Sequence, residues 1–281
     1  MPPDPASHPY FRGGGHQGRP LAFAHRGAAA HATENTAEAF QRAAELGFTH
    51  LETDVRATLD GVAVAFHDET LDRITDLRGP VADTTWPQLR SAALTGAGSV
   101  ARLDDLLGDF PDRCFNIDVK DVRAVGPLAA AVRRCRAHER VLVASFSERR
   151  LQEARRALGP TVATAIGPRG VAAVRAASAG GPLRSIPHGP GLALQVPERM
   201  GVPLVDRRFV AEAHRRGLQV HVWTVNEPSR MHALLDLGVD GLVTDDAPAL
   251  IGVWNARGGW PTPAAGRVAS PKGPAQRGNA P

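Results

Sequence analysis

Short runs of apolar residues alternate along this chain with longer stretches in which apolar residues recur every three or four positions. The first run is Leu21–Ala24, and after it Ala37, Phe40 and Ala44 share one face of an expected helix. Further runs of strand length are Thr49–Val55, Cys114–Val119, Val141–Ala144, Val162–Ala165, Leu192–Gln195, Leu218–Trp223 and Gly241–Thr244. Buried strands that alternate with helices are typical of a parallel α/β fold.

The expected strands and helices fill residues 21–254, close to the ~250 residues of a typical (β/α)8 barrel. The predicted fold class is therefore α/β, a TIM barrel. Between the second and third strands, about residues 57–101, the chain is too long for an ordinary loop and contains its own strand pattern, Val62–Phe66. We expect a small insertion there. The helix pattern is weakest in 168–205, where Gly and Pro are dense.

The two ends of the chain lie outside this pattern. Residues 1–20 are rich in Pro, Gly and His, and residues 255–281 are rich in Pro and Gly with Trp260 as their one aromatic residue. We expect both to be flexible tails, because they have little apolar surface to offset the entropy lost on ordering.

The positive charge of the protein is located in the expected tails. The whole chain carries +4, but the basic C-terminal tail has four basic residues and no acid, and residues 21–254 alone carry −1. The basic surplus therefore does not indicate a nucleic-acid partner for the barrel. No apolar run is long enough to insert stably in a membrane, and the first residues lack a secretory signal, so we expect a cytoplasmic protein. The sequence does not indicate an oligomeric state.

Acidic residues stand at the ends of two neighbouring expected strands. Glu52 and Asp54 lie on one face of the second strand, and Asp118 lies near the end of the third. Adjacent strands are only ~4.8 Å apart, so three carboxylates should converge at the barrel mouth, where catalytic groups of such barrels lie. Converging carboxylates need a cation, and oxygen ligands favour Mg²⁺ or Ca²⁺. Any one of these acids alone could instead cap a helix or pair with an arginine.

Basic side chains accompany these acids. Lys120 is one of only two lysines in a chain with 31 arginines, and it lies two residues from Asp118. A compact ammonium there suits a phosphate oxygen, and Arg26 at the end of the first strand is a second candidate for binding phosphate. The charges of the three acids and a phosphodiester are balanced by those of a divalent ion, Arg26 and Lys120.

Two histidines are the candidate proton carriers. His25 follows the first strand and His67 closes the strand of the insertion. Imidazole is the side chain whose ordinary pKa lies nearest neutrality, so the pair is suited to general acid and base catalysis. Displacement at phosphorus is the chemistry that this set of residues favours.

The order of these residues resembles that in the glycerophosphodiester phosphodiesterase family. The shared motifs, which span residues 21–250, are His25-Arg26-Gly27, Glu34-Asn35-Thr36, Leu51-Glu52-Thr53-Asp54-Val55, Thr58-Leu59-Asp60-Gly61, His67-Asp68 with Leu71-Asp72-Arg73, Asn116-Ile117-Asp118-Val119-Lys120, Trp223-Thr224-Val225-Asn226 and Thr244-Asp245. The family has a TIM barrel with an insertion after the second strand, in agreement with the pattern above.

The resemblance implies a metal-dependent hydrolysis of glycerophosphodiesters to glycerol 3-phosphate and an alcohol. It gives His25 the role of proton acceptor and His67 that of proton donor to the leaving alcohol, with Glu52, Asp54 and Asp118 as metal ligands. It also implies attack by the substrate's own glycerol hydroxyl, which forms a cyclic phosphate that water then opens. Asp118 departs from the Glu that is common in the family, which leaves the choice between Mg²⁺ and Ca²⁺ open.

Weaker candidates remain around this set. Glu34, Ser145 and Trp223 could line the pocket, although a loop serine and a core tryptophan are nearly as common. Thr33 stands where the family commonly has Pro, and we expect it to cap the first helix.

Two other functions stay open on the same fold. A lysophospholipase D would require an apolar groove, which the irregular region 168–205 could supply. A barrel that only binds phosphodiesters would have lost a histidine or an acid, and all of them are present. The preferred alcohol of the substrate cannot be told from these residues.

Overall fold

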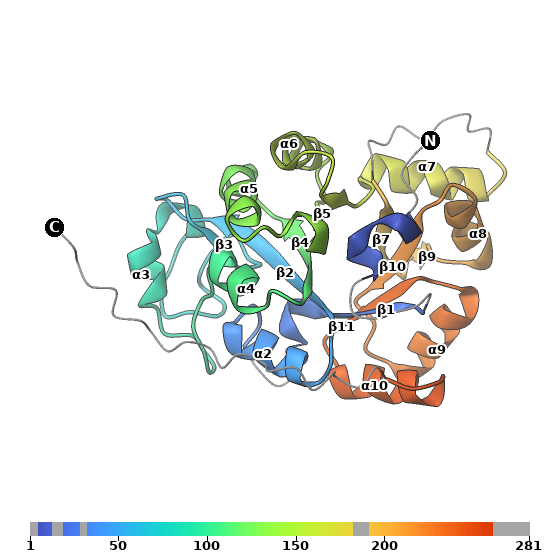
Figure 1. Cartoon of the computed structure of the whole chain (residues 1–281), viewed down its shortest axis with the longest axis horizontal. Helices are drawn as coiled ribbons and strands as arrows, with labels where there is room; N and C mark the ends of the chain where they lie inside the picture. The colour runs from blue at the N-terminus through green and yellow to red at the C-terminus, as the bar shows by residue number, and fades with distance from the viewer. Residues whose placement is uncertain (1–4, 13–18, 29–32, 182–190, 261–281) are drawn as a thin grey trace.

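A closed ring of eight parallel strands forms the centre of the computed structural model, which describes residues 5–12, 19–28, 33–181 and 191–260 (Figure 1). The strands, in their order around the ring, are β6 (Ala163–Thr164), β5 (Val141–Ala144), β4 (Cys114–Val119), β2 (His50–Ala57), β1 (Leu21–Ala24), β11 (Gly241–Thr244), β10 (Gln219–Trp223) and β7 (Ala193–Pro197). A parallel bridge between Ala165 and Ala193 joins the first strand of this order to the last. The predicted TIM barrel is confirmed.

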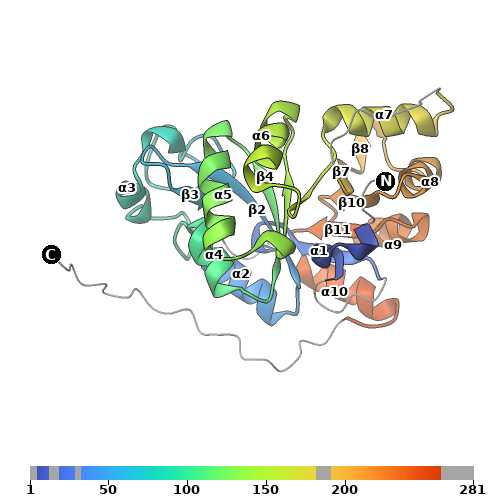
Figure 2. The same ribbon diagram turned by 45° about the horizontal axis from the view of Figure 1, so that its top comes forward.

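Helices cover the outside of this ring (Figure 2). They are α2 (Ala37–Glu45), α4 (Leu103–Asp109), α5 (Val125–Arg134), α6 (Glu148–Leu158), α7 (Pro168–Ser178), α8 (Arg207–Arg215), α9 (Pro228–Leu237) and α10 (Ala247–Ala256). Each buries apolar residues at helical spacing, as α8 does with Phe209, Val210 and Ala213. The cap of α2 differs from the prediction, because Thr36, not Thr33, accepts the hydrogen bond from the Ala39 amide.

The insertion after β2 packs around a small core of its own. Strand β3 (Ala63–Ala65) pairs antiparallel with the end of β2, and the short helices η4 (Val81–Asp83) and α3 (Trp86–Arg90) follow. Its buried cluster contains Val64, Phe66, Leu71, Ile74, Val81, Leu89 and Val100. The expected strand of the insertion is present, and it carries His67 to the mouth of the barrel just beyond its last residue.

The N-terminal segment is not a flexible tail throughout, so the prediction for residues 1–20 is wrong for residues 5–12. They form a short 3-10 helix (Pro5–Ser7) and helix α1 (Pro9–Arg12). Tyr10 is completely buried and Phe11 nearly so, and His50 Nε2 lies 3.0 Å from the Tyr10 carbonyl oxygen. These two aromatic side chains bury enough apolar surface to order the segment, although its composition is otherwise rich in Pro, Gly and His. Residues 1–4 and 13–18 lie outside the described part of the chain.

The folded part also extends past residue 254. Helix α10 ends at Ala256, and Trp260 packs edge-to-face on Phe48, with its Nε1 donating to the carbonyl oxygen of Leu46 at 2.7 Å. The predicted tail from residue 261 onward lies outside the described residues.

The segment with the weakest pattern contains more structure than expected. Helix α7 spans eleven residues of it, and after β7 a two-stranded hairpin, β8 (Arg199–Met200) with β9 (Val202–Pro203), projects beside the barrel mouth. None of the described helices has the length and apolar composition that a membrane span needs. The cytoplasmic location stays a prediction.

Candidate active site

Three carboxylates project from β2 and β4 into the cavity at the barrel mouth. The parallel register places Asp54 directly beside Asp118 and Glu52 beside Asn116. All four side chains line one cavity and are buried. The period of two along each strand therefore brings the predicted acids to one face.

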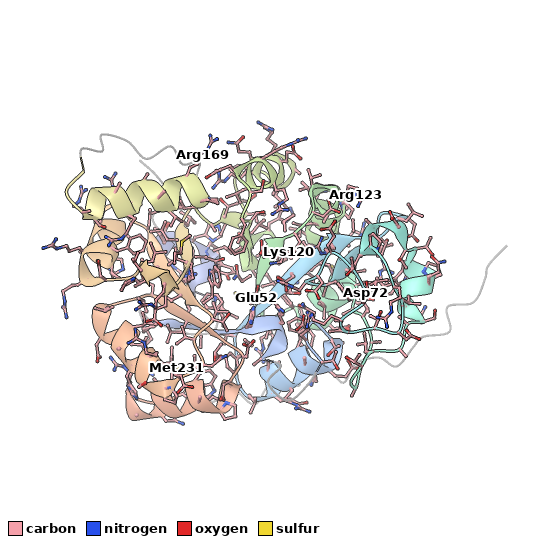
Figure 3. All side chains as sticks on the ribbon, turned by 180° about the vertical axis from the view of Figure 1, so that it is seen from behind. Glu52, Asp72, Lys120, Arg123, Arg169 and Met231 are labelled. Carbon is pink, nitrogen blue, oxygen red and sulfur yellow. The ribbon has the colours of Figure 1, made fainter. Side chains whose placement is uncertain are left out.

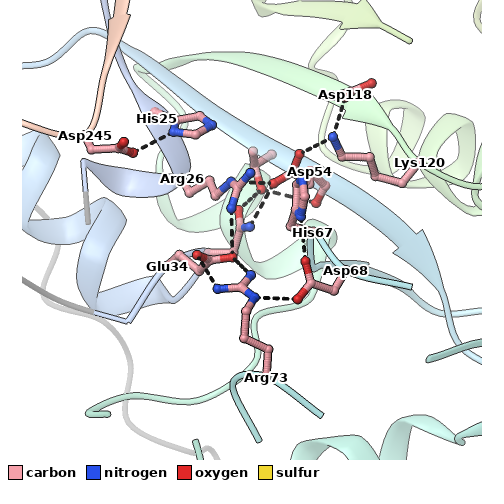
Figure 4. Close-up of polar contacts among 12 residues, drawn as sticks. His25, Arg26, Glu34, Asp54, His67, Asp68, Arg73, Asp118, Lys120 and Asp245 are labelled. Atoms are coloured by element: carbon pink, nitrogen blue, oxygen red, sulfur yellow. Dashed lines mark hydrogen bonds and ion pairs between the residues drawn. The ribbon is translucent and has the colours of Figure 1, made fainter. Parts of the chain in front are cut away.

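Two cations lie among these acids (Figure 4). Lys120 Nζ lies 2.9 Å from Asp54 Oδ1 and 2.6 Å from Asp118 Oδ2, and Arg26 Nε lies 3.0 Å from Asp54 Oδ2. Burial alone would raise the pKa of Asp54, but the charges of Lys120 and Arg26 outweigh it and lower that pKa. Asp54 is therefore ionised and held from both sides.

The other two acids are not neutralised to the same extent. Burial, followed by the charge of Asp54, raises the pKa of Glu52 to about 7, and burial also raises the pKa of Asp118. Asp118 Oδ1 is buried and has no hydrogen-bond partner among the described residues. With all three carboxylates ionised, the site would carry one more negative charge than Arg26 and Lys120 balance.

This surplus fits an oxygen-ligated divalent cation, but the acids do not form a ready metal cluster. Among the described residues, no three acidic, histidine or cysteine side chains converge at metal-binding spacing. The ammonium of Lys120 lies between Asp54 and Asp118 instead. Binding of a cation there would require this lysine to move away from one of the two carboxylates.

His25 follows β1 and is oriented by an acid from the other end of the chain. Its Nδ1 lies 2.6 Å from Asp245 Oδ1, and its Nε2 lies 3.8 Å from Glu52 Oε2. Asp245 is itself held by Asn226, whose Nδ2 donates to Oδ2 at 3.2 Å. Burial lowers the pKa of His25, but Glu52 and Asp245 outweigh burial and raise it. Because Nδ1 faces a carboxylate, Nε2 is the atom that is free to take a proton.

The turn after His25 has a backbone that few residues adopt. Arg26 and Gly27 have φ angles of 51° and 89°, and a Cβ on Gly27 would lie 2.6 Å from the Cβ of Ala39. This turn directs the Arg26 amide toward Glu52, to which it donates at 3.1 Å, while the guanidinium reaches Asp54. Glycine at position 27 therefore allows Arg26 to contact both acids.

His67 is oriented in the same way, by an acid of the insertion. Its Nδ1 lies 2.7 Å from Asp68 Oδ1, and Arg73 pairs with the other oxygen of Asp68. Arg73 Nη2 also lies 2.6 Å from Glu34 Oε1, which in turn is 3.0 Å from Arg26 Nη1. A chain of ion pairs thus connects His67 to Arg26 across two segments of the fold (Figure 4).

The three weaker candidates have different positions. Glu34 does not line the cavity; it lies behind Arg26 and joins it to Arg73. Ser145 does line the cavity, but its hydroxyl donates to the Val119 carbonyl at 2.9 Å and accepts from Arg150. Trp223 lines the cavity and packs edge-to-face on Phe146, with ring centroids 5.4 Å apart.

The site is one open cavity of about 840 Å³. Its floor is polar and contains both histidines, Arg26, Lys120 and the three acids, and Figure 3 shows Glu52 and Lys120 in the middle of the molecule. Two imidazoles that are each held through Nδ1 by a carboxylate can accept and donate protons. Two cations beside them can stabilise negative charge on phosphorus-bound oxygens.

Four residues that hold the two histidines in place have no role assigned from the sequence alone: Asp68, Arg73, Asn226 and Asp245. All four stand in the motifs that follow a strand or a histidine, and an acid directly after His67 was a usable signal. The pairing of Asp245 with His25 joins residues 220 positions apart, and nothing in the local sequence predicts it.

Comparisons with known proteins cover most of the chain. The model of the glycerophosphoryl diester phosphodiesterase family matches residues 25–249. A "Probable glycerophosphodiester phosphodiesterase 2" of Mycobacterium tuberculosis (strain ATCC 25618 / H37Rv) is 44% identical over 252 residues, which cover 87% of this chain and 94% of that protein.

Solved structures give the same result for the fold. A crystal structure from Silicibacter pomeroyi DSS-3, assigned to the glycerophosphoryl diester phosphodiesterases, is 26% identical, covers 90% of this chain and 99% of its own, and has a TM-score of 0.74. An Oleispira antarctica phosphodiesterase in complex with the product sn-glycerol-3-phosphate is 20% identical, covers 84% and 97% and has a TM-score of 0.68. At that identity the likeness concerns the fold alone.

Proposed function

The chain belongs to the glycerophosphoryl diester phosphodiesterase family, and on this basis we propose that it hydrolyses glycerophosphodiesters to glycerol 3-phosphate and an alcohol. The observation that carries the proposal is the pair of oriented histidines. His25 and His67 line the same cavity as Arg26 and Lys120, and each is held through Nδ1 by a carboxylate. In the overall reaction water adds across a P–O bond, which breaks to release the alcohol.

The two histidines divide the proton transfers. His25 Nε2 accepts the proton of the attacking hydroxyl, because Asp245 and Glu52 increase the basicity of its imidazole. His67 donates a proton to the alcohol that leaves. The family pattern supports attack by the glycerol hydroxyl of the substrate, after which water opens the cyclic phosphate with the histidines in reversed roles.

Arg26 and Lys120 bind the phosphate oxygens. Arg26 is held by Asp54 and Glu34, so its position at the floor of the cavity is fixed before substrate arrives. Lys120 contacts Asp54 and Asp118, and it would leave one of them for a phosphate oxygen when a cation occupies the site. Charge that develops on the oxygens during displacement is stabilised best by groups that need no rearrangement.

We further propose that Glu52, Asp54 and Asp118 hold one divalent cation, Mg²⁺ or Ca²⁺. The unpartnered Asp118 Oδ1 and the raised pKa of Glu52 support this assignment, because both acids lack a full countercharge. When bound, such an ion polarises a phosphoryl oxygen as a Lewis acid. The proposed partner of the site is a small molecule, the glycerophosphodiester.

Release of glycerol 3-phosphate from glycerophosphocholine tests the proposal. The native chain should be active and should lose activity in EDTA, and His25→Ala and Asp118→Ala should each reduce turnover by roughly 10²–10⁴-fold. His214→Ala is the matched control, since His214 also pairs with an acid, Asp240 at 2.8 Å, but lies outside the cavity. Unchanged turnover in His25→Ala would exclude the proposed site, and activity insensitive to EDTA would exclude the metal.

A further inference from the structure

A second cavity, of about 730 Å³, opens beside the active site. The insertion contributes Glu69 and residues 80–83 to its lining, and the segments that follow β4 and β5 contribute residues 120–123, Ser147, Arg149 and Arg150. Among the described residues, Lys120 is the one that lines both cavities. The two cavities therefore adjoin at this lysine.

The period of two that groups the acids of β2 and β4 continues outward with basic residues. Arg56 follows Asp54 by two residues on β2. Lys120 follows Asp118 by two residues, and Asp118 is the register partner of Asp54. The Lys120 amide donates to the Val55 carbonyl oxygen at 3.1 Å, so the pairing of the two strands extends to this level. Arg56 and Lys120 therefore occupy neighbouring positions one step beyond the two aspartates.

Two arginines of the second cavity have neutral oxygens as their hydrogen-bond partners. Arg56 Nε donates to the carbonyl oxygen of His67 at 2.9 Å. Arg150 donates to Ser145 Oγ at 3.0 Å and to the carbonyl oxygen of Lys120. Both arginines are partly buried, neither forms an ion pair with a carboxylate among the described residues, and burial lowers the pKa of Arg56. A partly buried charge without a countercharge favours an anionic ligand.

The other charged side chains of the second cavity are paired or exposed. Arg123 pairs with Asp121 at 3.2 Å, and the side chain of Arg149 is 82% exposed. Glu69 and Asp83 are exposed acids, so water and salt screen their charges. The less exposed part of the cavity is therefore positive, because the two arginines that lack a carboxylate partner lie there.

The contacts of these arginines place the second cavity on the side of the proposed proton donor. Arg56 holds the carbonyl oxygen of His67, and Glu69, two residues after this histidine, lines the cavity. His67 is the residue proposed to protonate the leaving alcohol, and Lys120 is proposed to bind the phosphate. A substituent on the leaving alcohol would therefore extend past Lys120 into the second cavity.

We propose that the second cavity binds an anionic group, a carboxylate or a phosphate, carried by the leaving alcohol. This inference rests on the proposed function and deepens it by naming a preferred class of substrate. Arg56 and Arg150 bind the anionic group while the phosphodiester lies at Arg26 and Lys120. Water adds at phosphorus, the P–O bond to the alcohol breaks, the alcohol takes the proton, and the second product is glycerol 3-phosphate.

Glycerophosphoserine and glycerophosphoethanolamine test this proposal, because they differ only in the carboxylate of the alcohol. Release of glycerol 3-phosphate gives kcat/KM for each. We expect the native chain to favour glycerophosphoserine by about tenfold or more, as charge-assisted hydrogen bonds from two arginines would provide. The preference should weaken as the salt concentration rises.

Two variants assign this preference to the second cavity. Arg56→Gln and Arg150→Gln remove the charge but keep an N–H group for the carbonyl oxygens of His67 and Lys120. Each should reduce the preference to within about threefold. The ratio of the two substrates cancels any effect on the catalytic groups, since both substrates use the same ones.

Arg155→Gln is the matched control. Arg155 lies on α6 with Arg150 and likewise donates to a hydroxyl, Thr164 Oγ1 at 3.0 Å, and to a carbonyl oxygen, that of Ala165 at 2.8 Å. It lines neither cavity, so the variant should keep the native preference. An equal loss of preference in Arg155→Gln would mean that the overall charge of the protein selects the substrate, and would overturn the proposal.

The remaining failures are distinguishable. Equal kcat/KM for the two substrates, or a preference that both Gln variants of the cavity retain, would overturn the anion site and leave the proposed function in place. If inorganic phosphate then changed kcat on glycerophosphoethanolamine in the native chain but not in Arg56→Gln, the cavity would bind a free anion instead. The absence of glycerol 3-phosphate release from either substrate would overturn both proposals.

Discussion

His25 and Asp245 form the shortest contact between a histidine and an acid in the described active site, with Nδ1 and Oδ1 2.6 Å apart. They directly follow β1 and β11, the first and last strands of the barrel, which are neighbours only because the barrel closes. His25, the proposed proton acceptor, is therefore oriented by the completed fold and not by its own loop.

We expect Asp245→Asn to lower the pKa of His25, because the carboxylate raises it in the native protein. A base acts in its unprotonated form, so the acidic limb of the profile of kcat/KM against pH should move to lower pH. The plateau should fall about 10- to 100-fold, since the protonated imidazole is less stabilised. Asp236→Asn, in an exposed ion pair with Arg257, should leave the profile unchanged. A profile in Asp245→Asn that matches the native one would show that Asp245 does not act on His25.

The ion pairs between the insertion and the barrel should matter for activity more than for stability. Arg73 is half-exposed and connects Asp68 to Glu34, so Arg73→Ala should reduce kcat/KM roughly tenfold by loosening His67, while the melting temperature changes by no more than about 3 °C. Arg78→Ala, at an exposed pair with Asp72, is the control and should have no effect on either. Equal activities of the two variants would contradict a positioning role for Arg73.

Substitutions at two glycines with positive φ distinguish the cost of backbone strain from that of a steric clash. Gly27 and Gly61 have φ angles of 89° and 78°, but only at Gly27 would a Cβ meet an atom within 4 Å. We expect Gly61→Ala to lower the free energy of unfolding by about 1 kcal/mol and Gly27→Ala by about 3 kcal/mol, measured by denaturant titration. Gly27→Ala should also reduce activity, because Arg26 is displaced. Equal losses of stability would mean that the contact with Ala39 is relieved without consequence.

The buried N-terminal segment provides a prediction on stability. The Tyr10 hydroxyl is buried and has no hydrogen-bond partner among the described residues, and burial raises the pKa of Tyr10 well above its ordinary value. Tyr10→Phe removes an unsatisfied group and should stabilise the protein by about 1 kcal/mol, whereas Tyr10→Ala leaves a cavity and should destabilise it by about 3–5 kcal/mol. A thermal melt of both variants checks this. Little change in Tyr10→Ala would mean that α1 does not pack on the barrel in solution.

Much of the barrel and the floor of its site follows from local patterns. The strand runs and the period of two along β2 and β4 are sufficient to place Glu52, Asp54 and Asp118 on one face. The sequence does not predict that Lys120 contacts both aspartates, because a lysine two residues from an acid could equally point toward a substrate.

The features that the sequence does not predict depend on contacts between residues far apart in the chain, or on small side chains that give little pattern. The burial of Tyr10 depends on its contact with His50, forty positions later, and the segment around it has the composition of a tail. The alanines of α7 give a weak apolar pattern, because alanine contributes little to hydrophobic periodicity.

The central claim is that His25 accepts a proton and His67 donates one to the leaving alcohol. It is tested most directly by comparing His25→Ala and His67→Ala on glycerophosphocholine and on a glycerophosphodiester whose leaving group is p-nitrophenol, an alcohol that departs without a proton. On glycerophosphocholine both variants should lose roughly 10²–10⁴-fold in kcat/KM. On the nitrophenyl substrate His67→Ala should come within about tenfold of the native chain, while His25→Ala stays impaired. Equal impairment of His67→Ala on the two substrates would contradict the assignment.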